Sequence, residues 1–421
     1  MECIRIKVID VVFREDLYPR IDHSPSTVQA YAEQLENLPP IEVNQRNELI
    51  DGWHRWTAHK KANQEFIEAI VTETTSDNEL LQLAIERNAA HGLQLSAEDK
   101  RTMAVKLYDG RNKEYLAKIL AVPMRTMRSW LERKDTTLRQ EREKKIYDLW
   151  LACYTSEEIA NMVGISDSEV KKTAVSFQTA ELPKGTILQA SHADLEPLPI
   201  YNIWKLKENS NKEIKHFGNT ADNILDRLLY LHTKPHEIVI DPFGGGGTTI
   251  DICKKRHRRY WVADRKPIPE REKEIRQADI AAGAPPLHKR WQDVSLLYLD
   301  PPYWKQAENK YSTDIEDLAN MSIDEFYNWL VDYITACASK MSVGATIALI
   351  IQPTQWKADN RETVDHVIDL IQLVKTKYLK YSHRISCPYE SQQCTPQMVN
   401  WAKENKQLLV LTREIIIWRR V

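Results

Sequence analysis

Three patterns of apolar and polar residues follow one another along the chain. Residues 1–76 mix short β-type runs, such as IRIKVIDVVF and FIEAIVTE, with a helical segment that opens on a capping residue, Ser24 or Ser26. Residues 77–182 have the apolar period of amphipathic helices. From residue 183 onward, short apolar runs alternate with helical stretches, which is typical of a parallel sheet covered by helices. The pattern predicts a multidomain protein with an α+β unit at 1–76, an all-α middle at 77–182 and an α/β unit at 183–421.

Charge, apolar runs and cysteine spacing limit the kinds of partner and site that we expect for this chain. A formal charge of −2 gives no overall attraction for nucleic acid, so any DNA contact must come from local basic surfaces. No stretch approaches the roughly 20 apolar residues that span a bilayer, and we expect a cytoplasmic protein without membrane contact. The cysteines form no CxxC pair, so we expect buried thiols and no metal site. They are Cys3, Cys153, Cys253, Cys337, Cys387 and Cys394.

A strand-like apolar run in LLYLDPPY ends abruptly on Asp300, Pro301, Pro302 and Tyr303. A plain strand explains the leucines but not an acid, two prolines and an aromatic side chain directly behind them. The prolines stiffen the turn and remove backbone donors, which leaves carbonyl and carboxylate acceptors and a ring face at the strand end. A proline turn without function is the alternative for this tetrad alone.

The segment EIVIDPFGGGGTTIDICKKRHRRYWVAD reads as strand, glycine-rich turn, helix, strand and acid. In a doubly wound sheet such a turn lies at the carboxyl edge, where glycines let a ligand approach the backbone. Asp264 then falls at the end of the next strand, where a carboxylate can hold a ribose. The spacing does not match the dinucleotide pattern G-x-G-x-x-G, and no GK[ST] is present, so another adenosine cofactor is favoured over a tight turn alone.

Together, DPFGGGGTT and DPPY resemble the amino-methyltransferases of DNA over residues 183–421. The resemblance implies a Rossmann-like domain, S-adenosylmethionine as cofactor, double-stranded DNA as partner, and restriction-modification as a setting. It assigns the tetrad Asp300, Pro301, Pro302 and Tyr303 to catalysis. It assigns to cofactor binding Asp241, Phe243, Gly245, Gly247, Thr248 and Asp264, and more weakly Asp293, Asn219 and Thr220.

The tetrad fits the chemistry of an exocyclic amino group. Its lone pair is delocalised into the base, so transfer needs acceptors that hold the amino protons, and Asp300 and the Pro301 carbonyl are such acceptors. Tyr303 offers a face on which a flipped base can stack. DPPY favours adenine N6 over cytosine N4 in the family this resembles. A regulatory protein that uses the cofactor as a sensor, and an RNA methyltransferase, remain the rivals.

Several basic segments invite a nucleic-acid interpretation. We expect KKRHRRYW, residues 254–261, to be a solvated helix end away from the ligand edge. Residues 304–312 and 375–384 interleave cations with aromatics and are better candidates for DNA contact.

The helical middle predicts two helix-turn-helix motifs. In TSEEIANMVGISDSEVKKTAV, Thr155 and Glu158 predict a capping box, and Gly164 predicts a turn. In EYLAKILAVPMRTMRSWLERK, we expect Ala117, Ala121 and Trp130 to be buried. The exposed cations proposed for DNA binding are Arg125, Arg128, Lys171 and Lys172, with Arg133 beside them. Plain helical hairpins are the alternative.

The N-terminal segment ELIDGWHRWTAHKKAN, with LYPRID and STVQAYAEQLENLPPIEVN before it, resembles the ParB and sulfiredoxin superfamily. The resemblance implies a phosphate site at Gly52, His54 and Arg55, at a helix start. Trp53 stands where sulfiredoxins place their reactive cysteine, which rules out that redox chemistry. A scaffolding or DNA-binding module and a working nucleotide site both stay open, as does homodimerisation.

Overall fold

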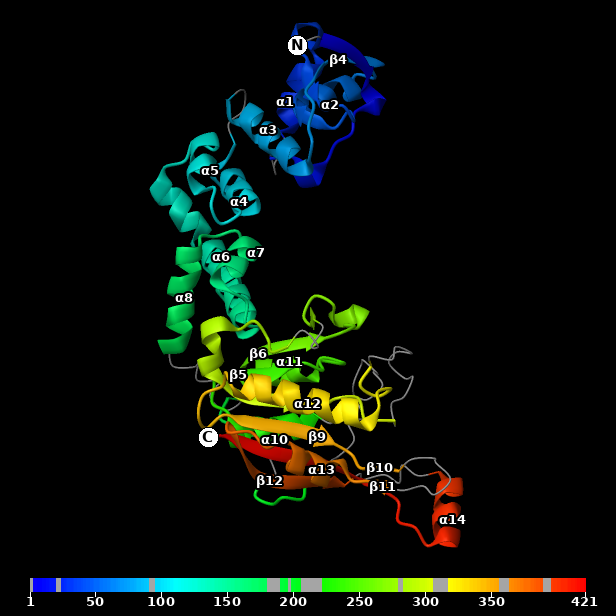
Figure 1. Cartoon of the computed structure of the whole chain (residues 1–421). Coiled ribbons are helices and arrows are strands. Elements are labelled where there is room, and N and C mark those ends of the chain that lie inside the picture. Colours follow the sequence, from blue (N-terminus) through cyan, green and yellow to red (C-terminus); the bar gives the residue numbers. More distant parts are fainter. Residues whose placement is uncertain are drawn as a thin grey trace. The chain divides into compact units, whose positions relative to one another are not determined.

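The computed structural model describes most of the chain, and its helices and strands are drawn in Figure 1. The described residues are 3–19, 24–90, 95–179, 190–195, 198–205, 222–278, 283–305, 317–355, 363–388 and 395–421. They form two compact units, Met1–Glu143 and Lys144–Val421. Helix α6 (Met124–Leu151) contributes residues to both units. The division into three domains at 76 and 182 stays a prediction.

The first unit contains the expected α+β fold. A four-stranded sheet has the order β1 (Cys3–Lys7), β4 (Phe66–Val71), β2 (Ile41–Val43) and β3 (Leu49–Asp51). Helices α1 (Pro25–Ala32) and α2 (Trp53–Lys61) accompany it. Ser24 is the N-cap of α1 and accepts the Thr27 N–H, as its position before Pro25 predicts. Alternate residues of β2 and β4, such as Ile41, Val43 and Ala69, form the core of this unit.

The rest of the first unit is helical. It contains α3 (Asp77–Ala90), α4 (Ala97–Leu107), α5 (Lys113–Ile119) and the first part of α6. These helices share a core that includes Leu81, Met103, Leu116, Leu120 and Met127.

The predicted burial in the α5–α6 segment is partly wrong. Ala117 is buried, but Ala121 is exposed and has a φ of 49° in the turn after α5. Leu120 takes the core position instead and is fully buried, while Trp130 is only partly buried.

A seven-stranded sheet forms the centre of the second unit, as Figure 1 shows. Its order is β12 (Leu379–Pro388), β13 (Thr412–Arg420), β9 (Thr346–Ile351), β8 (Val294–Leu299), β5 (Ile238–Asp241), β6 (Arg259–Asp264) and β7 (Arg276–Gln277). The five strands from β9 to β7 are parallel, and β12 and β13 add antiparallel pairs. Within this sheet the chain first forms β5, then β6 and β7 toward one edge, and then β8 on the opposite side of β5. The junction of β5 and β8 is therefore the topological switch point, where ligands bind in such sheets.

The central strands β5, β8 and β9 are buried along nearly their whole length, because helices cover both faces of the sheet. On one face Ile240, Leu297 and Leu299 pack with α12 (Ile323–Ala338) and α13 (His366–Leu373). On the other face Val239, Leu296 and Tyr298 pack with α10 (Asp222–His232) and α11 (Thr248–Lys255). Continuous apolar strands of this kind are typical of doubly wound parallel sheets. The remaining elements are α14 (Pro396–Asn405) and a small ladder of β10 (Thr354–Gln355) and β11 (Thr363–Val364).

The end of α6, α7 (Ser156–Val163) and α8 (Asp167–Thr179) belong to the second unit and attach to the amino edge of its sheet. Tyr147 Oη lies 2.7 Å from His257 Nδ1, and the Arg259 guanidinium lies 4.7 Å from the Trp150 ring centroid. Arg276 and Arg290 donate to the carbonyls of Ala152 and Cys153 at 2.7 and 2.5 Å. His257, Arg259, Arg276 and Arg290 each lie at or shortly before the start of a parallel strand.

The predicted caps of α7 are confirmed. Thr155 and Glu158 form a capping box, and Gly164 ends the helix with a φ of 71°. Glycine is suited to this left-handed position because it has no Cβ. Val170 of α8 is buried, so α7 and α8 form a packed helical pair.

The segment 254–261 runs from the end of α11 into the start of β6, away from the ligand edge as predicted, and Lys255 is exposed, but the expected solvation is wrong for its arginines. Arg256, Arg258 and Arg259 are 1, 2 and 4% exposed. Arg256 donates to Asp226 at 2.6 and 2.5 Å and pairs with Asp194, and Arg258 donates to the Thr233 and Ala190 carbonyls at 3.0 and 2.7 Å. Buried guanidinium groups are stable when carboxylates and carbonyls accept hydrogen bonds from their N–H groups. These side chains tie α10 and residues 190–194 to α11, and they offer no surface to DNA.

Cys153, Cys253, Cys337 and Cys387 are buried free thiols, whereas Cys3 is exposed, contrary to expectation. Cys394 lies outside the described residues. No helix within the described ranges has the length and apolar character needed to cross a membrane. In the same part of the chain, no group of three or more potential ligand side chains could hold a metal ion.

Candidate active site

Three aspartates predicted from the sequence meet at the carboxyl edge of the sheet. Asp241 ends β5, Asp264 ends β6, and Asp300 directly follows β8. Because these strands are parallel neighbours, their ends lie side by side at the switch point. Asp241 and Asp300 are far apart in sequence and are brought together only by the fold.

The glycine turn between β5 and α11 fits closely against β6. The Gly244 N–H donates to the Ala263 carbonyl at 2.8 Å, and a Cβ on Gly244 would lie 2.8 Å from Val262 Cγ1. Gly245 and Gly247 have φ of 45° and 82°, which only glycine adopts without strain. A turn without side chains leaves its backbone open to a ligand at the start of α11.

Asp264 is bound to this turn. Its carboxylate accepts the Gly245 N–H at 3.0 Å and the Lys266 N–H at 2.9 Å. Each oxygen accepts one backbone bond and keeps acceptor capacity for a ribose hydroxyl. The assignment of the glycine turn and this acid to an adenosine cofactor stays a prediction, and these free acceptor positions are the feature that supports it.

Asp241 has an unusual electrostatic environment. It is 2% exposed, accepts the Thr249 hydroxyl at 2.5 Å and accepts the Phe243 N–H at 2.9 Å. Burial raises its pKa to about 7, and the negative charges of Asp300 and Asp264 add to the rise, while the two hydrogen bonds oppose it. Thr249, the second threonine of GGGGTT, was not singled out from the sequence, where Thr248 was the matched residue.

The tetrad lies at the end of the central strand β8. Pro301 is buried, and Asp300, Pro302 and Tyr303 are half-buried. The Tyr303 hydroxyl lies 3.4 Å from Asp300 Oδ1, so the ring stands beside the carboxylate. This arrangement sets a hydrogen-bond acceptor next to an aromatic face.

A buried network, which sequence reasoning missed, supports the residue after the tetrad. The Thr354 hydroxyl donates to the Trp304 carbonyl at 3.1 Å, and His366 Nε2 lies 2.9 Å from the same hydroxyl. His366 Nδ1 lies 2.8 Å from the Tyr327 hydroxyl, which donates to Asp369 at 2.8 Å. His366 is fully buried, and burial lowers its pKa to about 4. A threonine and a histidine far along the chain carry no motif that would reveal them.

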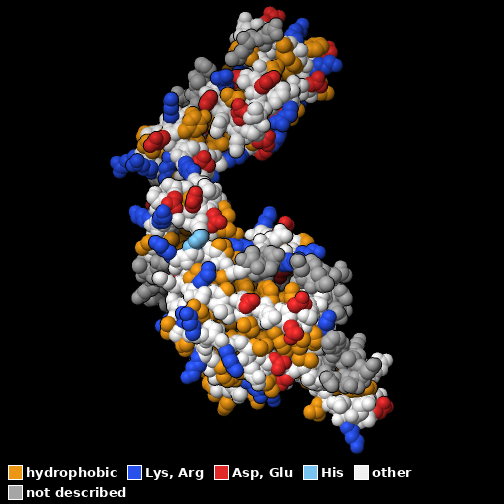
Figure 2. Space-filling model, in the orientation of Figure 1, with side chains coloured by type: hydrophobic (Ala, Val, Ile, Leu, Met, Phe, Trp, Pro, Cys, Tyr) orange, Lys and Arg blue, Asp and Glu red, His pale blue; other side chains and the backbone are white. Residues whose placement is uncertain are grey.

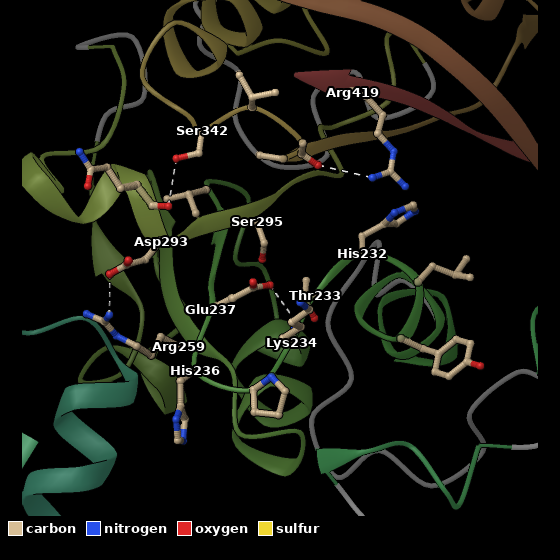
Figure 3. A pocket seen from close by; sticks show the side chains of 18 residues that line it. His232, Thr233, Lys234, His236, Glu237, Arg259, Asp293, Ser295, Ser342 and Arg419 are labelled. Carbon is tan, nitrogen blue, oxygen red and sulfur yellow. Dashed lines mark hydrogen bonds and ion pairs between the residues drawn. The ribbon is translucent and has the colours of Figure 1, made fainter. Parts of the chain in front are cut away.

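The proposed role of Asp293 at the cofactor is corrected by its position. Asp293 precedes β8, whereas Asp300 follows it, so the two acids lie at opposite edges of the sheet. Asp293 is exposed and pairs with Arg259 at 3.2 Å. Figure 3 shows this pair in a hollow of about 680 Å³ that also includes His232, Lys234 and Arg419. The hollow is lined by strand starts and is separate from the three converging aspartates.

Other predicted residues have different outcomes. Asn219 and Thr220 lie outside the described residues. Phe243 is half-buried and packs against the core on the α12 side, where its ring centroid lies 6.1 Å from that of Trp329. Phe243 therefore anchors the turn.

The cations proposed for DNA binding divide into two groups. Arg125, Arg128 and Arg133 are exposed on α6, and Figure 2 shows Lys and Arg side chains gathered on this part of the surface. Lys171 and Lys172 are exposed on α8, where Lys171 pairs with Asp167 at 2.5 Å. The first group is the more open to a phosphate backbone.

At the proposed phosphate site, Gly52 is the N-cap of α2 with a φ of 103°. Arg55 donates to the Pro39 and Pro40 carbonyls at 3.1 and 2.6 Å and pairs with Asp51 at 2.5 Å. His54 Nε2 accepts the Ser24 N–H at 3.3 Å. The two side chains hold α2 against neighbouring segments in the described structure.

Comparison with known proteins identifies the family. A family model described as DNA methylase matches residues 53–268, about half of the chain, and the match includes the glycine turn and Asp264. The chain belongs to this DNA methylase family. Membership identifies S-adenosylmethionine as the methyl donor, in agreement with the cradle described above.

Individual relatives match shorter segments. The transcriptional regulator NovG from Streptomyces niveus is 33% identical over 91 residues, which are 21% of this chain and 28% of the regulator. The type II methyltransferase M.BamHI from Bacillus amyloliquefaciens is 28% identical over 78 residues, 18% of this chain and 16% of the enzyme. The chain thus spans less than a third of the length of either relative. A ParB structure from Caulobacter crescentus, in complex with its parS site, has 15% identity, covers 46% of this chain and 94% of that protein, and gives a TM-score of 0.25.

Proposed function

We propose that the protein methylates DNA at the exocyclic amino group of a flipped base, and the target that we favour is adenine N6. The observation that carries the proposal is the position of the Asp300–Tyr303 tetrad at the end of β8, directly beside the glycine turn at the end of β5. This position sets amino-group acceptors next to the cofactor cradle. The tetrad and the cradle therefore serve one reaction.

Each residue has a distinct role in this proposal. The backbone of Gly245 and Gly247 and the carboxylate of Asp264 hold the cofactor, which supplies an activated methyl group. Asp300 and the Pro301 carbonyl accept hydrogen bonds from the two amino N–H groups and orient the nitrogen lone pair, while Tyr303 holds the base by stacking. One of the two amino protons leaves on methyl transfer, and the methylated nitrogen keeps the other. The protein contributes orientation and electrostatics, and no covalent bond to the enzyme is needed.

DNA is gripped outside the active site in this proposal. Arg125 and Arg128 on α6 are exposed cations that suit phosphate contacts, and α5 with the start of α6 is the proposed helix-turn-helix reader. Lys171 and Lys172 are weaker candidates, because α8 belongs to a helical pair attached at the amino edge of the sheet. The internal contacts of His54 and Arg55 favour a scaffolding or DNA-binding role for the N-terminal module over a nucleotide site.

The experiment that tests the proposal uses purified full-length protein, mixed-sequence duplex DNA and radiolabelled S-adenosylmethionine. After incubation, the DNA is digested to nucleosides, and the labelled nucleoside is identified. We expect the label on 6-methyladenine. Label on 4-methylcytosine would keep the mechanism and change the target base.

The second candidate function is a regulator that binds the cofactor without transferring its methyl group. The similarity to NovG over 91 residues is the observation that favours it. Cofactor binding without label on DNA would support this candidate, and label on RNA alone would support an RNA methyltransferase. The intact acid at position 300 argues for turnover.

A further inference from the structure

The ring of Tyr303 is in contact with an arginine from β13, a strand that β9 separates from β8. Arg413 is the second residue of β13, and its guanidinium lies 5.8 Å from the Tyr303 ring centroid. Tyr303 in turn stands beside Asp300. Arg413 therefore touches the residue to which the proposed function assigns base stacking, although it lies 110 positions away in the sequence.

We propose that Arg413 is a positioning residue that holds the Tyr303 ring when DNA is absent and binds a backbone phosphate of the flipped nucleotide when DNA is present. The inference rests on the proposed function, because it concerns how the target nucleotide is held in the same site. Besides the stacking of the base on Tyr303, the Arg413–phosphate contact would be a second DNA contact at the reaction centre.

The position of β13 assigns Arg413 to the DNA side of the site. Two strands, β9 and β8, separate β13 from β5, which carries the cofactor turn. Arg413 lies opposite Cys387 in β12, at the edge where β8 and β9 end. A contact with the cofactor would require the side chain to reach across both strands and the tetrad. The target nucleotide at the tetrad is therefore the partner within reach of Arg413.

In the local pattern of β13, Arg413 lies outside the apolar core. Ile415 and Ile417 share its face of the strand and are fully buried, whereas Arg413 at the strand's beginning is half-buried. The next residue, Glu414, is buried and accepts the Ser386 hydroxyl at 2.8 Å. Glu414 stabilises the β12–β13 pair, and Arg413 extends past the core to the tetrad.

The chemistry of guanidinium favours a phosphate as the second partner. A planar guanidinium stacks on an aromatic ring and also donates two parallel hydrogen bonds to a phosphate. Charge-assisted hydrogen bonds of this kind are stronger than a cation–ring contact at a half-exposed position. When a base stacks on Tyr303 and its phosphate arrives beside the ring, a two-pronged contact with that phosphate is within the chemistry of the Arg413 guanidinium.

The test compares Arg413→Ala and Arg413→Lys with Arg419→Ala as matched control. Arg419 lies on the same strand and the same face, but at the amino edge, and it is exposed. For each full-length protein, DNA binding to mixed-sequence duplex is measured at several salt concentrations, S-adenosylmethionine binding by calorimetry, and methyl transfer by kcat and KM. Unchanged cofactor affinity and melting temperature verify folding.

For Arg413→Ala we expect the KM for DNA to rise about tenfold and the slope of log affinity against log salt to fall by about 0.9, the loss of one phosphate contact. Arg413→Lys should restore the salt slope but not the full KM, because it keeps the charge and loses the planar geometry. Arg419→Ala should behave as wild type in both measurements.

An unchanged salt slope and KM in Arg413→Ala would overturn the inference, and so would a fall in kcat alone, which would indicate support of Tyr303 without a phosphate contact. Failure of the proposed function would look different, because wild-type protein would then transfer no label to DNA. In that case the salt-slope comparison of Arg413→Ala with wild type still decides whether Arg413 contacts a phosphate.

Discussion

The Gly245 N–H donates to Asp264 Oδ2 at 3.0 Å, and this bond joins the turn after β5 to the end of β6. The acid that we assign to the ribose thus also fixes the loop that cradles the cofactor. Cofactor binding and loop order depend on the same carboxylate.

Replacing Asp264 with alanine should lower the affinity for S-adenosylmethionine by at least tenfold. The change removes hydrogen bonds to a charged acceptor, each contributing about 1.5–3 kcal/mol, and frees the Gly245 amide. Calorimetric titration measures this loss. Asp264→Asn, which keeps one acceptor oxygen, should fall between wild type and alanine, and equal affinity in all three proteins would contradict the assignment.

Replacing Asp300 with alanine should abolish methyl transfer and leave cofactor binding within about threefold of wild type. The reason is that Asp300, which we assign to the target base, follows β8, while the residues that we assign to the cofactor follow β5 or end β6. Transfer of radiolabel to DNA and calorimetric titration measure the two properties separately. Wild-type activity in Asp300→Ala would show that another acceptor holds the amino protons.

The affinity for S-adenosylmethionine should rise as the pH increases through about 7. Asp241, with a pKa of about 7, is protonated below this pH and negatively charged above it. A positively charged sulfonium nearby is better stabilised by the carboxylate, so binding should release a proton near neutral pH. Titration in buffers of different ionisation enthalpy detects this proton, and Asp241→Asn should release none.

Folding stability should decrease as the pH falls from about 6.5 to about 4. The pKa of His366 is about 4 in the folded protein, while the unfolded chain binds a proton near 6.5, so acid favours unfolding in this interval. His366 alone would contribute a loss of about 3 kcal/mol at pH 4. Denaturant unfolding at several pH values should show a smaller acid loss in His366→Gln, and an identical loss would assign the effect elsewhere. His232 and His236, whose pKa values burial also lowers to about 4, add to the acid loss in both proteins.

The double variant Arg125→Ala and Arg128→Ala should bind duplex DNA more weakly than wild type and with a salt slope reduced by about 1.8. These side chains are exposed and suited to phosphate contacts. The matched variant Lys171→Ala and Lys172→Ala should have a smaller effect, because Lys171 already pairs with Asp167. A larger effect of the lysine pair would move the DNA-contacting surface to α8.

Patterns that are local in the sequence predicted the structure well. The apolar runs predicted β5, β6 and β8, and DPFGGGGTT and DPPY predicted the residues that meet at the strand ends, because parallel strands carry their carboxyl ends to one edge. Capping residues such as Thr155 and Glu158 were equally readable, since a cap depends on neighbours within one turn.

Features that depend on distant partners could not be predicted. The burial of Arg256 depends on Asp226 and Asp194, which the sequence does not mark as its partners. Asp293 and Asp300 are close in the sequence, but the whole of β8 lies between them and places them at opposite edges of the sheet. Arg413 reaches Tyr303 only through the strand order, and His366 supports Trp304, the residue after the tetrad, only through the packing of α13.

The place of β13 in the sheet has a consequence for biosynthesis. Its residues, 412–420, lie between β9 and β12, so the sheet is incomplete until the segment has left the ribosome. While it is still in the exit tunnel, β9 presents an unpaired, predominantly apolar edge of the kind that recruits other chains. The sheet of the second unit is therefore complete only after synthesis of this segment, and we expect a nascent chain that stalls before residue 412 to be bound by chaperones or degraded by proteases.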